Sequence, residues 1–312
     1  MKKPFLTYSQ QLDSLIENKG LIVEDRTAAI DTLKRTGYFA LINGYKVPFR
    51  DADTKKYRQG VRFTDIEALY RFDVDLSSIL LRYLLSCERH LKSLFAYHFM
   101  KMYGDEESVY LNLENYDTST PEHRQEAKEL LNLLRGLARE ESDMEFLDHY
   151  RSNYDDVPMW AVVHALTFGQ LERLYWCAQP RLRDVICSEL SAIKSKNLIS
   201  YLSVLVQLRN VCAHSHPVYN LQLERVYLPV LGVHHEMGLV RGSAAASGQR
   251  DLFAGLIALH ALLPANEFAM LIKEIDAALT ELFRQASWLD RKEMLGLMGF
   301  PENWKDLSTV RT

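Results

Sequence analysis

The chain has 312 residues, 47% of them hydrophobic, so it can bury a large core as one big domain or two modest ones. Its 37 lysines and arginines against 41 aspartates and glutamates give a formal charge of −4. This charge excludes a globally basic nucleic-acid-binding protein and leaves any phosphate contact to local patches.

The first elements in the chain are helical. Thr7 and Gln10 form a capping box ahead of a helix that Gly20 closes, and a second helix is expected from Asp25 to Gly37. The aromatic segment YFALINGYKVPFRD then interrupts the helical pattern and predicts an ordered loop.

A long central helix follows this loop. Thr64 and Glu67 form another capping box, and an amphipathic stretch without proline or glycine predicts one long helix from Asp75 to about Tyr103. Asp73 and Asp75 are expected to cap it, and Glu88 within it is a plausible internal partner for an arginine.

Further helices are expected at PEHRQEAKELLNLLRGLAREE, MWAVVHALTFGQLERLYWCA, PRLRDVICSEL and KSKNLISYLSVLVQL. Beyond them RVYLPVLGVHHEMGLV predicts a short β-hairpin, RGSAAASGQR a mobile loop, and the remainder two more helices. The fold class is therefore all-α, with an N-terminal helix pair and a C-terminal helical extension. We interpret residues 1–312 as one domain, with a weak candidate boundary at 241–250.

Several features bear on the compartment. The N-terminal stretch MKKPFLTYSQQLDSL lacks the apolar core of a signal peptide, and the longest apolar run, AGLIALHALLPA, is far shorter than the ~20 residues that span a bilayer. Four cysteines without CxxC spacing, Cys87, Cys177, Cys187 and Cys212, favour reduced thiols. We expect a cytoplasmic protein without a membrane segment.

The stretch QLRNVCAHSHPVYN carries the most chemistry. Arg209 lies on the same apolar helix stripe as Leu202 and Leu205, so it needs either a carboxylate inside the fold or a cleft that receives an anion. Pro217 predicts that the helix ends between Cys212 and Ser215, which places His214 at its terminus.

Arg209, Asn210 and His214 supply what metal-independent cleavage of RNA requires: a cation, an orienting amide and an imidazole that moves protons. The ribose 2′-OH is then the nucleophile, which DNA lacks. Arg209 and His214 differ by about 140° on an ideal helix, so one chain serves one phosphate only if the helix end unwinds, whereas a symmetric dimer can share the site. Capping and a buried ion pair remain the structural alternative.

Two other groups of residues are candidate sites. Lys55, Lys56 and Arg58 lie among aromatic residues in a segment that suits RNA, or that is a solvated loop anchored by its aromatics. Cys212, His214 and His216 alternate as metal ligands do, and His234 and His235 lie downstream, but alternating ligands at a helix end diverge, and no metal or cofactor is expected.

Four stretches follow one another over roughly residues 3–223: KPFLTYSQQLDSLIENKGLIVED with GYF…GYKVPF, FTDIEALYRFDVDLSSILLRYLLSCERHLKS, VPMWAVVHALTFGQLERLY and LRNVCAHSHPVYN. In this order they resemble the Abi-like proteins of bacteria, the AbiD/AbiF group of abortive-infection phage-defence factors. Residues 224–312 resemble nothing that we can place.

The Abi-like family is similar to the HEPN superfamily of helical-bundle ribonucleases, which usually act as dimers and carry an arginine and a histidine with four to six residues between them. The resemblance implies that Arg209, Asn210 and His214 form the catalytic motif of an RNA-cleaving toxin, and His216 is a candidate RNA contact. It also implies a homodimer, and a structured small non-coding RNA that restrains the protein. The alternative is a non-catalytic module that holds a regulatory RNA. Many relatives have a second histidine directly after the motif, where this chain has Ser215, so substrate contacts differ there.

Overall fold

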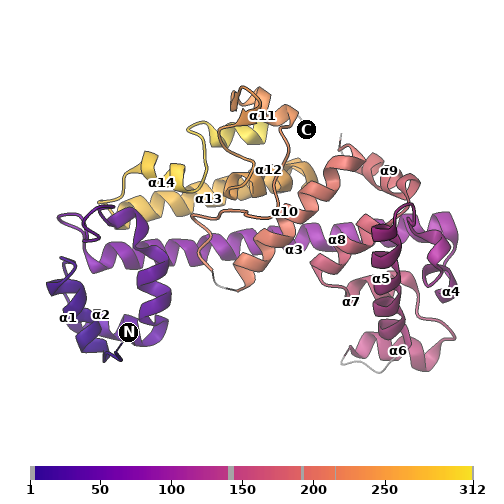
Figure 1. The fold of residues 1–312 in the computed structure, drawn as a ribbon, viewed down its shortest axis with the longest axis horizontal. Coiled ribbons are helices and arrows are strands. Elements are labelled where there is room, and N and C mark those ends of the chain that lie inside the picture. Colours follow the sequence, from indigo (N-terminus) through magenta and orange to yellow (C-terminus); the bar gives the residue numbers. More distant parts are fainter. Residues whose placement is uncertain (1–3, 140–143, 191–192, 215, 311–312) are drawn as a thin grey trace.

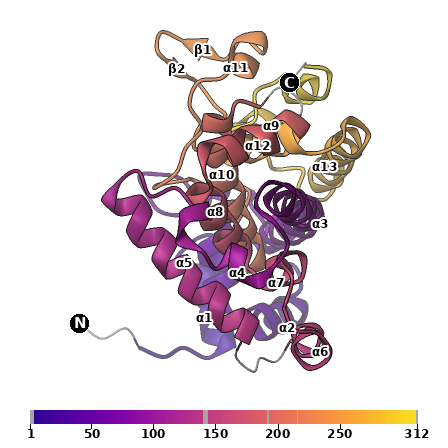
Figure 2. The same cartoon turned by 90° about the vertical axis from the view of Figure 1, so that its right-hand side faces the viewer.

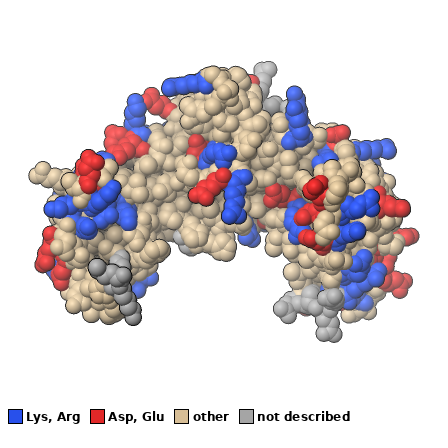
Figure 3. Space-filling model, in the orientation of Figure 1, with Lys and Arg blue, Asp and Glu red and all other residues tan. Residues whose placement is uncertain are grey.

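The computed structural model describes residues 4–139, 144–190, 193–214 and 216–310, and it is mostly helical. The helix α3 (Phe63–Tyr103) crosses the whole molecule, and the other helices pack along it (Figure 1). Two lobes extend to the same side from the ends of α3, and the space-filling view shows a hollow between them (Figure 3). The molecule therefore has the shape of an arch.

The central helix α3 is longer than the sequence predicted. It has 41 residues, about 60 Å at 1.5 Å per residue, and packs against α13, α7, α10 and α9. Its first turn is capped by Asp65, whose carboxylate accepts the backbone N–H of Arg62 at 2.8 Å. The predicted capping roles of Asp73 and Asp75 are wrong, because both residues lie inside the helix.

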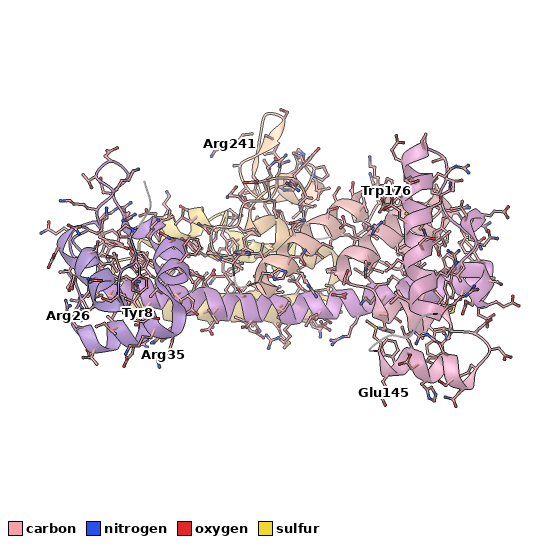
Figure 4. All side chains as sticks on the ribbon, turned by 60° about the horizontal axis from the view of Figure 1, so that its bottom comes forward. Tyr8, Arg26, Arg35, Glu145, Trp176 and Arg241 are labelled. Carbon is pink, nitrogen blue, oxygen red and sulfur yellow. The ribbon has the colours of Figure 1, made fainter. Side chains whose placement is uncertain are left out.

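The N-terminal lobe contains the predicted helix pair, α1 (Tyr8–Glu17) and α2 (Arg26–Thr36). Thr7 and Gln10 form the predicted capping box: each residue's backbone N–H donates to the other's side chain, at 2.9 and 3.4 Å. The expected loop contains a π-helix, η1 (Phe39–Asn43), and a short 3₁₀-helix, η2 (Val47–Phe49). Figure 4 shows Tyr8, Arg26 and Arg35 in this lobe.

The second lobe is built from α5 (Pro121–Arg139) and from shorter helices: α4 (Glu107–Tyr110), η3 (Leu113–Asn115), α6 (Glu145–Asn153), α7 (Met159–Ala165), α8 (Phe168–Cys177) and α9 (Pro180–Glu189). Glu145 marks the tip of this lobe in Figure 4. The single helix predicted over residues 159–178 is two helices, because Leu166 is extended and Thr167 begins α8 with its own capping box.

Glu88 stabilises this break instead of pairing with an arginine. Its carboxylate lies 2.8 Å from Lys92 Nζ, and both residues are buried. Lys92 also donates to the backbone oxygens of His164 and Leu166, so the buried ammonium caps the end of α7. The prediction of an arginine partner for Glu88 is wrong.

The C-terminal extension covers one face of α3 and α10 (Ser195–Ala213) through α12 (Leu252–Leu262) and α13 (Ala265–Gln285), followed by α14 (Arg291–Leu297) and η4 (Trp304–Thr309). The hairpin is displaced from its predicted position. Residues 225–240, where the hairpin was predicted, contain a helix, α11 (Gly232–Glu236), whose His234 accepts the backbone N–H of Leu231 at 3.0 Å. The hairpin β1 (Val240–Arg241) and β2 (Ala244–Ala245) lies in the predicted mobile loop, where Gly242 adopts a positive φ of 65° (Figure 2).

Candidate functional site at the end of helix α10

The helix α10 runs from the second lobe to the underside of the arch, so its C-terminal end lies near the middle of the hollow (Figures 1 and 3). Its last helical residue is Ala213, and the N–H of His214 still donates to the oxygen of Asn210 at 3.0 Å. The N–H of His216 closes the end by donating to Val211 O at 3.3 Å. This confirms the predicted helix end, although Ser215 lies outside the described residues.

Arg209 is half-buried, and few groups of the protein itself pair with its positively charged guanidinium. Its Nη1 donates to Asn210 Oδ1 at 3.4 Å, while its Nε is buried without a hydrogen-bond partner. No carboxylate forms an ion pair with it among the described residues. A guanidinium has five N–H donors, and a buried cation normally takes a carboxylate or phosphate partner. Of the two arrangements that the sequence allowed, an internal carboxylate partner for Arg209 is not observed among the described residues.

His214 is exposed beside this arginine but lies on another face of the helix. The hydrogen bond from its N–H to Asn210 keeps the backbone wound through this residue, so the unwinding needed to align both groups in one chain is not observed. No hydrogen bond joins the imidazole to Arg209 or to Asn210 within the described parts of the chain. Each chain thus presents the cation and the imidazole in different directions.

The segment after the motif, Val218 and Tyr219, is held by Asp73, which the sequence predicted to be a helix cap. The buried carboxylate accepts the N–H of Val218 at 3.0 and 3.1 Å, the N–H of Tyr219 at 2.7 Å and the hydroxyl of Tyr45 at 2.9 Å. Burial raises the pKa of Asp73 to about 6, although these hydrogen bonds oppose the rise. Asp73 shares the apolar stripe of Leu69, Leu76 and Leu80, and this spacing could have identified it as an interior group.

Tyr219 strengthens this attachment. Its ring stacks on that of Tyr45, with centroids 5.7 Å apart, and its hydroxyl donates to Gly44 O at 3.1 Å. A side chain at Gly44 would approach Pro217 to 3.2 Å, which shows how closely η1 and the post-motif segment pack. The backbone beyond His214 is therefore fixed to α3 and to the N-terminal lobe.

A cavity of about 230 Å³ adjoins the helix end. Its walls come from α3, from the loop after η1 and from the end of α10, and it is lined by Tyr45, Tyr70, Asp73, Val74, Ser77, Ser78, Leu81, Cys212 and His216. His216, the candidate RNA contact, is thus part of this cavity.

The metal interpretation finds no support in the geometry. Cys212 is buried, and burial raises the pKa of its thiol to about 12. His234 is also buried, and its two ring nitrogens bond to Leu231 N–H and Gly248 O. Within the described ranges, no three histidine, cysteine or acidic residues are grouped as metal ligands would be.

The basic segment, residues 45–63, fits only part of the predicted RNA-binding surface. Its four aromatic rings, those of Tyr45, Phe49, Tyr57 and Phe63, are buried, so they anchor the segment and do not offer faces to RNA bases. Lys55 and Lys56 are exposed, whereas Arg58 forms a two-pronged ion pair with Glu293 at 3.1 and 3.2 Å and lies over the ring of Trp288.

The fold and the helix end define a class: an all-α protein with an unneutralised arginine and an exposed histidine where a helix ends. The chain matches the model of the Abi-like protein family over residues 31–220, more than half of its length, and it belongs to that family of abortive-infection phage-defence proteins. This confirms the resemblance seen in the sequence. No curated protein and no solved structure matches the chain. None of the described helices is long and apolar enough to cross a membrane.

Proposed function

We propose that the protein is a metal-independent endoribonuclease of the HEPN type that acts as a toxin in phage defence. The observation that carries this proposal is the half-buried guanidinium of Arg209, whose partners among the described residues include a neutral amide but no carboxylate. A purely structural arginine at this depth would be expected to have an internal anion. A phosphate of bound RNA supplies one.

The reaction follows from the groups at hand. The imidazole of His214 removes the proton of a ribose 2′-OH, and the resulting oxyanion attacks the adjacent phosphorus. The bond from phosphorus to the 5′-oxygen of the next nucleotide breaks, and that oxygen takes up a proton from water. The products are a 2′,3′-cyclic phosphate and a 5′-OH, and Arg209 neutralises the charge that develops on the non-bridging oxygens.

A homodimer gives this chemistry its simplest geometry. Because α10 stays helical up to His214, Arg209 and His214 of one chain are separated by about 140° around the axis. Two such helix ends related by a two-fold axis place the arginine of one protomer opposite the histidine of the other. We further propose that a structured small RNA restrains this site until infection.

Induction in bacteria tests the proposal first. The wild-type chain should halt growth and fragment RNA, whereas Arg209→Ala at equal abundance should do neither. Purified protein should cleave single-stranded RNA in the presence of EDTA and leave 2′,3′-cyclic phosphate ends. RNA binding without cleavage would favour the non-catalytic module, and activity restored only by a divalent metal would contradict the mechanism.

A further inference from the structure

The cavity beside α10 has the position of a substrate subsite. Cys212, which lines it, lies three residues after Arg209, and residues at this spacing are neighbours on one helix face. The cavity therefore continues the stripe on which the arginine lies. An RNA strand whose phosphate reaches Arg209 has its neighbouring ribose and base within reach of this cavity.

The lining includes polar groups that the protein itself does not use. Among the described residues, the hydroxyls of Tyr70 and Ser77 and the ring of His216 form no hydrogen bond. Tyr70 and Ser77 are half-buried and His216 is exposed, so these groups are open to a ligand that enters the cavity. The side chains that line the cavity can thus donate hydrogen bonds to, and accept them from, one flat polar group.

The size and charge of the cavity limit the kind of ligand that it can bind. Its volume of about 230 Å³ is smaller than the roughly 300–1,000 Å³ of sites for drug-sized molecules, and it suits one small ring system. The carboxyl group of Asp73 forms part of the wall and would repel a phosphate. A half-buried tyrosine ring with nearby hydroxyls, here that of Tyr70, is instead typical of pockets that take an unstacked base of single-stranded RNA.

We propose that this cavity binds one base of the RNA strand whose phosphate Arg209 holds, and that Tyr70, Ser77 and His216 read its edge. The inference rests on the proposed function for its ligand, but it concerns binding and not cleavage. Asp73 and Tyr45 act here as positioning residues, because they hold the post-motif segment that carries His216 against the cavity.

The test measures binding in a chain that cannot cleave. In a His214→Ala background, fluorescence anisotropy is recorded with short single-stranded RNAs in which one position carries each of the four bases. Filling the cavity with Ser77→Leu should weaken binding about tenfold and abolish the difference between bases, since stacking of one base has about this value. Tyr70→Phe should keep most of the affinity and alter the base preference.

Matched controls use the same substitutions away from the cavity. Ser188→Leu on the exposed face of α9, and Tyr97→Phe on α3 with a ring that is 55% exposed, should leave affinity and preference unchanged. Thermal unfolding verifies that each variant is folded.

The outcomes separate this inference from the proposed nuclease. Unchanged affinity and preference in Ser77→Leu would overturn the pocket, even if the wild-type chain cleaves RNA. Loss of the base preference in Ser77→Leu would support the pocket, even if the wild-type chain proves inactive in cleavage. If neither the His214→Ala chain nor the wild-type chain binds RNA, both proposals fail.

Discussion

The end of α10 and the 45–63 segment look alike in sequence, since both combine cations with polar and aromatic residues, yet the fold treats them differently. In the 45–63 segment Arg58 pairs with Glu293 and Arg62 pairs with Glu24, while Arg50, whose Nε also has no hydrogen-bond partner, lies over the buried ring of Tyr57. At the end of α10, Arg209 has no such anion among the described residues. The comparison teaches that a cation left without an internal partner indicates a ligand better than local basic composition does.

The largest expected effect separates Arg209 from a structural arginine. Arg209→Ala and His214→Ala should each lower RNA cleavage by about 10²- to 10⁴-fold, because each removes a group that acts in the transition state. Their free energies of unfolding in urea should change by less than about 1 kcal/mol, because no internal ion pair is lost.

The contrasting variant is Arg183→Ala. Arg183 Nη2 lies 3.2 Å from the buried carboxylate of Asp117, and its side chain is 23% exposed. Its loss should cost about 1–3 kcal/mol, less than the ~3–5 kcal/mol of a fully buried pair, and leave cleavage per folded molecule intact. If Arg209→Ala is the more destabilised of the two, Arg209 is a structural residue.

Complementation tests whether the two helix ends share one site. Arg209→Ala and His214→Ala chains with different tags are co-expressed, and the heterodimer is isolated through both tags. It holds one intact and one doubly damaged cleft, so it should recover roughly half of the wild-type cleavage rate. Inactive heterodimers, or a wild-type chain that is fully active as a monomer by light scattering, would contradict a shared site.

Asp73 should make stability depend on pH. Its folded pKa of about 6 exceeds the ordinary value of 3.8, so the folded state binds the proton more tightly and stability falls as pH rises through this interval. Between pH 4 and pH 7 the wild-type chain should lose about 1–3 kcal/mol relative to Asp73→Asn in urea unfolding. The two proteins are compared in a His216→Gln background, because the imidazole of His216 lines the same cavity and would titrate in the same pH range. Parallel pH profiles would show that Asp73 is not buried as described.

The smallest effect concerns the basic segment. Changing Lys55, Lys56 and Arg58 to glutamine together should flatten the salt dependence of RNA binding by about 1.4 in the log–log slope, since two lysines contribute about 0.7 each. Arg58→Gln alone should leave the slope unchanged, because Arg58 is already neutralised by Glu293. A flatter salt dependence of RNA binding with Arg58→Gln alone would show that Arg58 leaves Glu293 and binds phosphate.

Local sequence signals predicted the helices whose ends they encode. Thr7 and Gln10 cap α1 as expected, Asp25 and Gly37 bound α2, and Pro217 follows an α10 that ends at Ala213. These signals succeed because each involves neighbours within one turn of the chain. The split at Leu166 was missed because the Thr167 capping box lies inside a continuous apolar pattern.

By itself, the sequence determined the helical class and the family, and it predicted Arg209, Asn210 and His214 as the candidate site, because these depend on residue type and short spacing. Only the tertiary structure decided which ionised groups meet. Arg58 meets Glu293 from the far end of the chain, Lys92 donates to backbone oxygens 72 and 74 residues away, and Asp73 receives amides 145 and 146 residues away. Such contacts arise because the packing of α3 against α7, α10 and the C-terminal helices brings together groups that are distant in the sequence, and a buried charge then requires a partner.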